Sequence, residues 1–502
     1  MKKIILYFVF SLALFNSYSS SKLINSEMTQ LKEIYVWPKN IKNTITYKEL
    51  ENDLDFLFYY ISQAYVGYEE MKLNGYDEEK IDSFIKNKYQ NQENIFTKDV
   101  YEDIYKVLFK YIIDRHFTIY DHNALLAISA CKNLSCLLTN TFVNEYENKY
   151  YVCETDSSYL KVGDEYIGDK KCLFYYPSKG TSIYRIGKFV SSELSNEDFL
   201  FNKGNISLKL YDDGVIQYSP TIKYHDIETK GSVYVSLSSF VLPPEDSKYR
   251  KGADLVLEKF SNIGSKWYKK QNIIIDLRSN VGGRAVYGEY AIWSLYDKKH
   301  SAFSYKTQNT MYKFLDSTYF ETTTIESPAT VLAHLKLFEI TDELNTTYGK
   351  IFVTKMKKMQ KNPQKNTFAQ TLENKTTEFS SNYDGKLVFL IDRNTLSASE
   401  TMVLIAKKII GPDKVIVIGE NSGGCAKYWD VMDYYLPNTG ISISLCSSKN
   451  DYLENNPCWY GEGAGIFPDY WSTGQDLNET IFLVTQDEEM KQKLKGISSR
   501  LM

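Results

Sequence analysis

The feature that most constrains the fold is a series of continuous apolar runs in the second half of the chain, each followed by a helix-like segment. A strand that is apolar on both faces has to be covered on both faces, which is typical of a sheet between helices. We therefore expect an α/β core over residues 231–480, interrupted by a polar insertion at 301–384. The runs that define this core are Val233–Leu237, Asn272–Leu277, Lys386–Ile391 and Lys414–Ile418.

Two other patterns precede the core, and a chain of 502 residues has room for roughly two to four domains. Over residues 45–135, apolar side chains recur every three or four positions, which predicts an N-terminal helical domain. One of its helices is expected from Val100, after a cap at Thr97–Asp99. Over residues 141–230, short alternating runs between turn signals predict a small β-rich module.

Residues 1–19 have the order of a secretory signal peptide. Lys2 and Lys3 precede an apolar run, Ile4–Phe15, and small polar residues follow it. The run is shorter than the roughly 20 residues that cross a bilayer. We expect a secreted or periplasmic protein without a transmembrane span after signal removal, and an uncleaved anchor is the alternative.

Charge and residue usage exclude several function classes. The 59 Lys+Arg and 63 Asp+Glu residues leave a net charge of -4, whereas dedicated nucleic-acid binders have a basic face. Only five histidines and seven cysteines are present, and their spacing matches no zinc signature, so we expect neither a metal site nor a cofactor. Export permits disulfides, and we expect structural pairs among the cysteines.

Two loops that follow predicted buried strands carry candidate chemistry. Ser397 begins a helix, where the helix dipole and nearby backbone N–H groups favour a nucleophile and an oxyanion. Ser397 and Glu400 also have the spacing of a capping box, which taken alone favours a structural role. Gly282 and Gly283 let backbone N–H groups approach a ligand closely, although paired glycines fit any tight turn equally well.

Four motifs occur in a characteristic order: Ile-Ile-Ile-Asp-Leu-Arg-Ser-Asn-Val-Gly-Gly, Thr-Leu-Ser-Ala-Ser-Glu, Val-Ile-Gly-Glu-Asn and Glu-Gly-Ala-Gly-Ile-Phe-Pro-Asp. With them the sequence resembles the C-terminal processing (tail-specific) serine peptidases and their tricorn-core relatives, over roughly residues 231–475. The resemblance implies a core related to the crotonase and Clp-protease folds. It also implies Ser397 as nucleophile and an oxyanion hole made by the backbone N–H of Ala398 and of Gly282 or Gly283.

The general base differs between the branches of this family. The processing-protease branch has a lysine after its Gly-Glu motif, and Cys425 occupies that place here. Lys427 lies two residues on, displaced by about 6.6 Å along an extended strand, which is far for a base that needs contact at about 3 Å. Lys427 nevertheless stays the alternative base.

The tricorn-like branch uses a histidine in an Asp-x-His motif, which His116 matches. A histidine can take the serine proton near neutral pH. The resemblance thus implies His116 as base and then acid, oriented by Glu462 in the closing motif. Glu454 could substitute for that glutamate, and His122 is a weaker candidate base.

The segment Leu160–Ile167 resembles the Leu-x-x-Gly-Asp-x-Ile element of PDZ domains, which capture peptide carboxyl termini, so the β-rich module is a candidate divergent PDZ-like module. We expect a serine endopeptidase that hydrolyses peptide bonds of unfolded or flexible polypeptides through an acyl-enzyme on Ser397. The alternative is a non-catalytic member of the same fold that binds peptides or apolar ligands, which the missing lysine leaves open.

Overall fold

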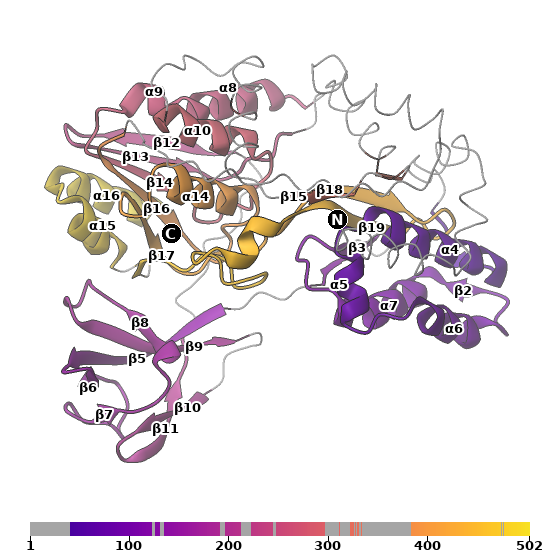
Figure 1. Cartoon of the computed structure of the whole chain (residues 1–502), viewed down its shortest axis with the longest axis horizontal. Helices are drawn as coiled ribbons and strands as arrows, with labels where there is room; N and C mark the ends of the chain where they lie inside the picture. Colours follow the sequence, from indigo (N-terminus) through magenta and orange to yellow (C-terminus); the bar gives the residue numbers. More distant parts are fainter. Residues whose placement is uncertain are drawn as a thin grey trace, which may run out of the picture. The chain divides into compact units, whose positions relative to one another are not determined.

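The computed structural model describes two compact units (Figure 1). Unit 1 comprises Met1–Ala130, Thr323–Gln370 and Tyr428–Lys449, and unit 2 comprises Cys131–Thr322, Thr371–Lys427 and Asn450–Met502. The predicted signal peptide and most of the predicted insertion lie outside the described residues. The structure describes residues 41–122, 126–130, 135–190, 196–211, 222–243, 247–296, 311, 322–325, 327, 329–330, 333, 383–472, 474 and 476–501.

The N-terminal part of unit 1 is helical, as the apolar spacing predicts. Its first helix has a capping box in which the N–H of Thr46 donates to Oε2 of Glu49 at 2.8 Å. The last α-helix of this N-terminal part starts at Thr97 itself, so the residues predicted as its cap, Thr97–Asp99, are already helical. The α-helices are α4 (Tyr47–Ala64), α5 (Tyr68–Leu73), α6 (Glu78–Tyr89) and α7 (Thr97–Leu108), and a short pairing joins β1 (Thr44–Ile45) to β2 (Ile95–Phe96).

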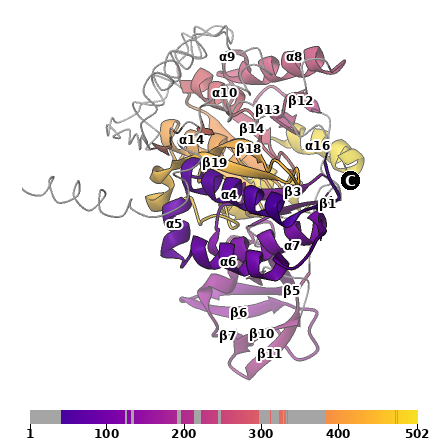
Figure 2. The same ribbon diagram turned by 90° about the vertical axis from the view of Figure 1, so that its right-hand side faces the viewer.

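A sheet with strands from distant parts of the sequence completes unit 1. Its order is β15-β19-β3-β4, and β18 pairs antiparallel with β19. Apolar side chains of β18 and β19 share one core with α4, and α4 lies beside β19 in both views (Figures 1 and 2). The strands are β3 (Thr118–Asp121), β4 (Leu126–Ser129), β15 (Thr322–Thr324), β18 (Tyr428–Tyr435) and β19 (Ser442–Asn450).

The largest element of unit 2 is a six-stranded sheet in the order β12-β13-β14-β16-β17-β20. All its pairings are parallel except that of the edge strand β12. Its strands are β12 (Tyr224–Glu228), β13 (Ser232–Leu237), β14 (Asn272–Asp276), β16 (Lys386–Ile391), β17 (Val415–Gly419) and β20 (Tyr470–Trp471). The predicted apolar strands are therefore confirmed.

Helices cover both faces of this sheet. Successive residues of a strand point to opposite faces, so strands that are apolar throughout make both faces apolar. Val233 and Val235 belong to one apolar cluster, and Tyr234 between them belongs to the other. The first cluster is completed by α8 (Arg250–Ser261), α9 (Ile263–Trp267), α10 (Val286–Tyr296) and α14 (Ala398–Ile409), and the second by α15 (Leu477–Thr485) and α16 (Glu488–Leu501). The structure confirms the predicted α/β core.

The β-rich module is a seven-stranded sheet in the order β11-β10-β7-β6-β5-β9-β8. Its described residues contain strands and the short 3-10 helix η2 (Lys170–Cys172) but no α-helix. The strands are β5 (Ser135–Tyr146), β6 (Lys149–Glu154), β7 (Glu165–Tyr166), β8 (Leu173–Tyr175), β9 (Ile183–Val190), β10 (Asn196–Phe201) and β11 (Gly204–Lys209). The β-rich character is confirmed, and the PDZ-like resemblance stays a prediction.

The structure also bears on the expected disulfides and on membrane-spanning helices. No disulfide joins any two of the six described cysteines, so the expected structural pairs do not form among them, and Cys131 lies outside the described residues. The pairing register explains one case, because Cys136 lies opposite Phe189 rather than opposite another cysteine. None of the helices in the described ranges has the length and apolar character that a membrane crossing requires.

Candidate active site

Ser397 sits at a strained turn between the buried strand β16 and the helix α14. Its backbone has φ 53° and ψ -118°, a conformation that costs a residue with a Cβ roughly 1–3 kcal/mol. Hydrogen bonds on both sides hold it there. The N–H of Leu396 donates to the carbonyl of Asn280 at 3.0 Å, and the N–H of Ser397 donates to Oε2 of Glu400 at 3.0 Å. Strain fixed in this way is a recurring feature of functional sites.

Glu400 does more than cap the helix. Its carboxylate is fully buried and accepts four hydrogen bonds. Oε2 binds the N–H of Ser397 and, at 2.7 Å, the N–H of Cys425, while Oε1 binds the hydroxyl of Ser422 and, at 2.8 Å, the N–H of Gly424. The capping interpretation is therefore incomplete, because this side chain also ties the candidate nucleophile to the loop that follows β17.

The glycine loop after β14 lies directly against Ser397. A Cβ on Gly282 would lie 2.7 Å from the carbonyl oxygen of Leu396 and 2.8 Å from Cβ of Ser397, so no larger residue fits. Gly282 and Gly283 also have φ of 90° and 127°, which glycine adopts without strain. Both constraints explain why this loop carries paired glycines.

The buried side chain of Asn280 decides which N–H groups of this region are available. Its Oδ1 accepts the N–H of Gly282 at 3.0 Å, and its amide group donates to the carbonyl of Leu237 at 2.9 Å. Within the described part of the chain, the N–H groups of Gly283 and Ala398 have no acceptor. The geometry therefore favours Gly283 over Gly282 as the partner of Ala398 in the predicted oxyanion hole.

A second buried carboxylate, which the sequence reasoning missed, joins the same two loops. Asp392 accepts the N–H groups of Ser279 and Asn394, both at 2.9 Å. Burial raises the pKa of Asp392, and the two backbone donors offset part of that rise. The available signal was its position directly after an apolar strand, where polar side chains meet at the carboxyl ends of parallel strands.

Lys427, the alternative general base, contacts two glutamates. Its ammonium group lies 3.3 Å from Oε1 of Glu454, and its backbone N–H donates to Oε1 of Glu462 at 2.9 Å. Glu454 thus binds the lysine, and Glu462 holds the backbone beside it. Cys425, at the place of the family lysine, is buried and is fixed through its N–H by Glu400.

His116 belongs to unit 1, where it lies between η1 (Phe109–Tyr111) and β3. Its backbone N–H donates to Oδ1 of Asp114 at 2.8 Å. Burial lowers the pKa of His116 to about 4, with a smaller effect of the Arg115 charge, so the imidazole is neutral at pH 7. A neutral imidazole can accept a proton, which a general base has to do.

His122, the weaker candidate base, also lies in unit 1. Its Nε2 lies 3.1 Å from Oγ of Ser442, and its ring contacts Tyr120 edge to face with centroids 4.3 Å apart. Burial lowers its pKa, and the charges of Asp121 and Asp433 oppose that shift. These contacts describe a histidine held between strands β3 and β19.

Residues 232–471 match the family model of peptidase family S41. The core of this chain belongs to peptidase family S41. Membership supports a peptidase function, and it supports the resemblance to the C-terminal processing peptidases. Comparison with curated proteins finds no significant match.

Solved structures resemble the S41 peptidase only distantly. Mature CPAF is 13% identical with a TM-score of 0.42, and the alignment covers 91% of this chain and 98% of that one. The photosystem II D1 C-terminal processing protease is 12% identical with a TM-score of 0.36, covering 88% and 98%. The tricorn protease is 11% identical with a TM-score of 0.30, covering 91% and 37%. The family assignment rests on the family model and not on these likenesses.

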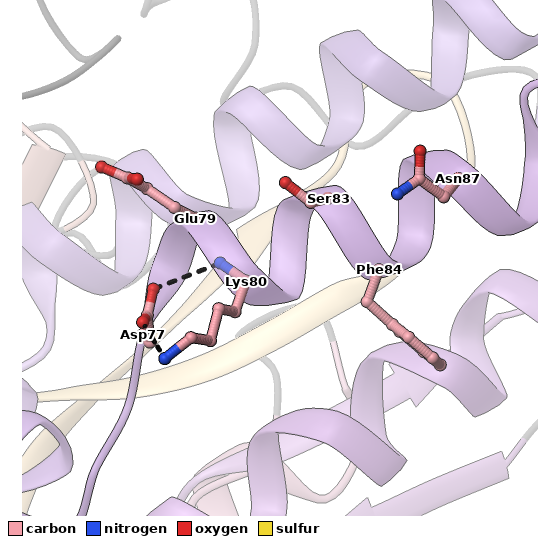
Figure 3. A pocket seen from close by; sticks show the side chains of 6 residues that line it. All are labelled: Asp77, Glu79, Lys80, Ser83, Phe84 and Asn87. Carbon is pink, nitrogen blue, oxygen red and sulfur yellow. Dashed lines mark hydrogen bonds and ion pairs between the residues drawn. The ribbon is translucent and has the colours of Figure 1, made fainter.

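An open hollow on unit 1 is a poor alternative site for the S41 peptidase. It lies along α6, and its side chains do not converge, since Phe84 points away from Ser83 and Asn87 (Figure 3). Asp77 and Lys80 form an ion pair with each other at 2.8 Å. The loops around Ser397 remain the better candidate.

Proposed function

We propose that this S41 peptidase is an exported serine endopeptidase that hydrolyses unfolded or flexible polypeptides through an acyl-enzyme on Ser397. The observation that carries the proposal is the strained Ser397 turn, beside which the N–H groups of Ala398 and Gly283 have no acceptor among the described residues. Backbone donors of this kind stabilise an oxyanion because they need no reorganisation during the reaction.

The chemistry follows from these groups. Oγ of Ser397 attacks the scissile carbonyl carbon while its proton passes to His116. The N–H groups of Ala398 and Gly283 bind the resulting oxyanion. As the tetrahedral intermediate collapses, the peptide C–N bond breaks and His116 returns the proton to the leaving amine. Water then repeats the sequence on the acyl-enzyme and releases Ser397.

The contact between Glu454 and the ammonium group of Lys427 supports His116 rather than Lys427 as the base. The imidazole of His116 is neutral at pH 7 and can accept a proton, and its pKa of about 4 makes it a weaker base than an ordinary histidine. An orienting role of Glu462 rests on the family resemblance. The contact between Glu462 and the backbone N–H of Lys427 fixes the loop that carries Glu462. Export rests on the signal-like residues 1–19.

Covalent labelling with a fluorophosphonate tests the nucleophile. We expect the full-length protein to take up one label, and Ser397→Ala to take up none while also losing cleavage of a disordered protein substrate. Ser399→Ala is the matched control, because this neighbouring buried serine donates to the carbonyl of Asn280 and should not react. Full labelling of Ser397→Ala would exclude Ser397 as the nucleophile, and an unreactive wild type would favour the non-catalytic binding alternative.

The base is tested by comparing His116→Ala with Lys427→Ala. We expect turnover to fall by about 100-fold or more in the histidine variant, the contribution of a positioned general base. The lysine variant should keep most of its turnover. The reverse result would assign the base to Lys427 and contradict the role of His116.

A further inference from the structure

Three side chains with metal-ligating atoms gather in unit 1. Asp114 and His116 precede β3, and Cys446 lies on β19. Strand β19 pairs antiparallel with β3 and places Ser444 opposite Thr118, so Cys446 comes next to the start of β3. One ligand atom from each of the three side chains lies within 4.8 Å of the other two.

The carboxyl group of Asp114 lies buried beside the imidazole of His116, whose Nδ1 is 3.8 Å from Oδ1 of Asp114. It is completely buried, and its Oδ1 accepts the N–H of His116. Its Oδ2 has no hydrogen-bond partner of normal geometry among the described residues. A buried carboxyl group of this kind gains more than an exposed one from binding a cation.

We propose that Asp114, His116 and Cys446 bind a single Zn²⁺ ion, and that this binding inhibits the peptidase. A thiolate, an imidazole nitrogen and a carboxylate oxygen are the ligand types that Zn²⁺ prefers, and three of them leave the fourth position to water. Tetrahedral bonds of about 2.0–2.3 Å place ligand atoms about 3.5 Å apart. The cluster has to contract by about 1 Å, and the thiol proton of Cys446 is released to solvent.

Inhibition rests on the proposed function, whereas binding does not. A metal ion on His116 engages the nitrogen lone pair, so the ligated imidazole can no longer take the proton of Ser397. The side chain of His116 is 15% exposed, while Asp114 and Cys446 are fully buried, so the ion has to enter past the histidine. The spacing of the cysteines along the sequence did not predict this site, because its ligands come from two distant segments.

Binding is measured on full-length, reduced Ser397→Ala protein, so the result does not depend on catalysis. In a calorimetric titration with Zn²⁺ we expect one ion per chain, and with Co²⁺ a thiolate-to-metal charge-transfer band. Adding Cys446→Ser should weaken Zn²⁺ binding by about 10–100-fold or more and remove the band. The matched control is Cys153→Ser, which removes an exposed thiol outside the cluster.

Several outcomes would overturn the proposal. These are no binding, binding unchanged in Cys446→Ser, or binding lost in Cys153→Ser. Circular dichroism verifies that the variants fold, and the Co²⁺ band of the parent protein identifies a thiolate ligand even where Cys446→Ser fails to fold. In the active protein, Zn²⁺ should abolish turnover and a chelator should restore it. Stoichiometric binding without inhibition would overturn the inhibitory role and contradict His116 as base, but would leave the metal site in place.

Discussion

Glu400→Gln tests whether this buried carboxylate sets the geometry of Ser397, the proposed nucleophile, or only caps a helix. The four donors around it limit where the new amide group can go. The two donors to Oε2 are the backbone N–H groups of Ser397 and Cys425, and a backbone N–H cannot become an acceptor. The side near Oε1 is more tolerant, since the Ser422 hydroxyl can rotate and accept. The amide nitrogen is therefore expected there, facing the N–H of Gly424.

The substitution should cost about 2–4 kcal/mol of unfolding free energy. The bond to Gly424 is lost, and a hydrogen bond to a charged group contributes about 1.5–3 kcal/mol. The three remaining bonds also weaken, because the acceptor becomes neutral. We expect turnover and fluorophosphonate labelling to fall together by at least about tenfold, since small displacements of a reacting group are costly. Urea denaturation and single-turnover cleavage measure the two effects.

The control is Glu49, the glutamate of the capping box at the start of α4. Glu49 accepts the N–H of Thr46 at the start of α4, and its side chain is 27% exposed. Glu49→Gln should cost only about 0.5–1 kcal/mol and leave turnover unchanged. If Glu400→Gln behaves in the same way, Glu400 is a helix cap and the reasoning about loop coupling is wrong.

Three further predictions concern the glycine loop and unit 1. Gly282→Ala should lower turnover by about 100-fold, because the added Cβ would lie 2.7 Å from the carbonyl oxygen of Leu396. The control is Gly75→Ala, which also has a positive φ, of 88°, but has open space around it and should affect stability alone. If His116 is the base, the acid limb of kcat/KM should lie near its pKa of about 4, and a limb near 6.5 would contradict the assignment. The raised pKa of Asp114, from 3.8 to about 7, makes stability fall as pH rises through that window. The lowered pKa of His116, from 6.5 to about 4, makes stability rise between about pH 4 and 6.5. The two slopes, each about 1.4 kcal/mol per pH unit, oppose one another over that range. Asp114→Asn should therefore leave a rise that urea denaturation detects, and an unchanged pH profile would refute the balance.

The α/β core was predictable because its signals are local. Continuous apolar strands, glycine pairs and a serine at a helix start each act over a few neighbouring residues. The structure adds that Gly282 and Ser397 are brought together by adjacent parallel strands, β14 and β16.

The remaining features depend on contacts that spacing along the chain does not reveal. Three of the four bonds of Glu400, from Ser422, Gly424 and Cys425, depend on a loop that lies one helix and one strand further along the chain. Asn280 decides that Gly283 rather than Gly282 has an available N–H, which a motif shared by both glycines cannot distinguish. The sequence predicted a core over residues 231–480 with an insertion at 301–384, and within that range Tyr428–Lys449 groups with unit 1, a grouping that depends on strand pairing over long distances in the sequence.

That assignment of Tyr428–Lys449 has a consequence for biosynthesis. Strand β3 pairs with β19, so the sheet of unit 1 cannot close until the ribosome has made residues up to about 450. At about 5–20 residues per second, this follows the synthesis of β3 by roughly 15–65 s. The segment that carries His116 therefore lacks its β19 partner until that strand has been synthesised. If His116 is the base, a nascent chain should remain inactive until about residue 450 has been made.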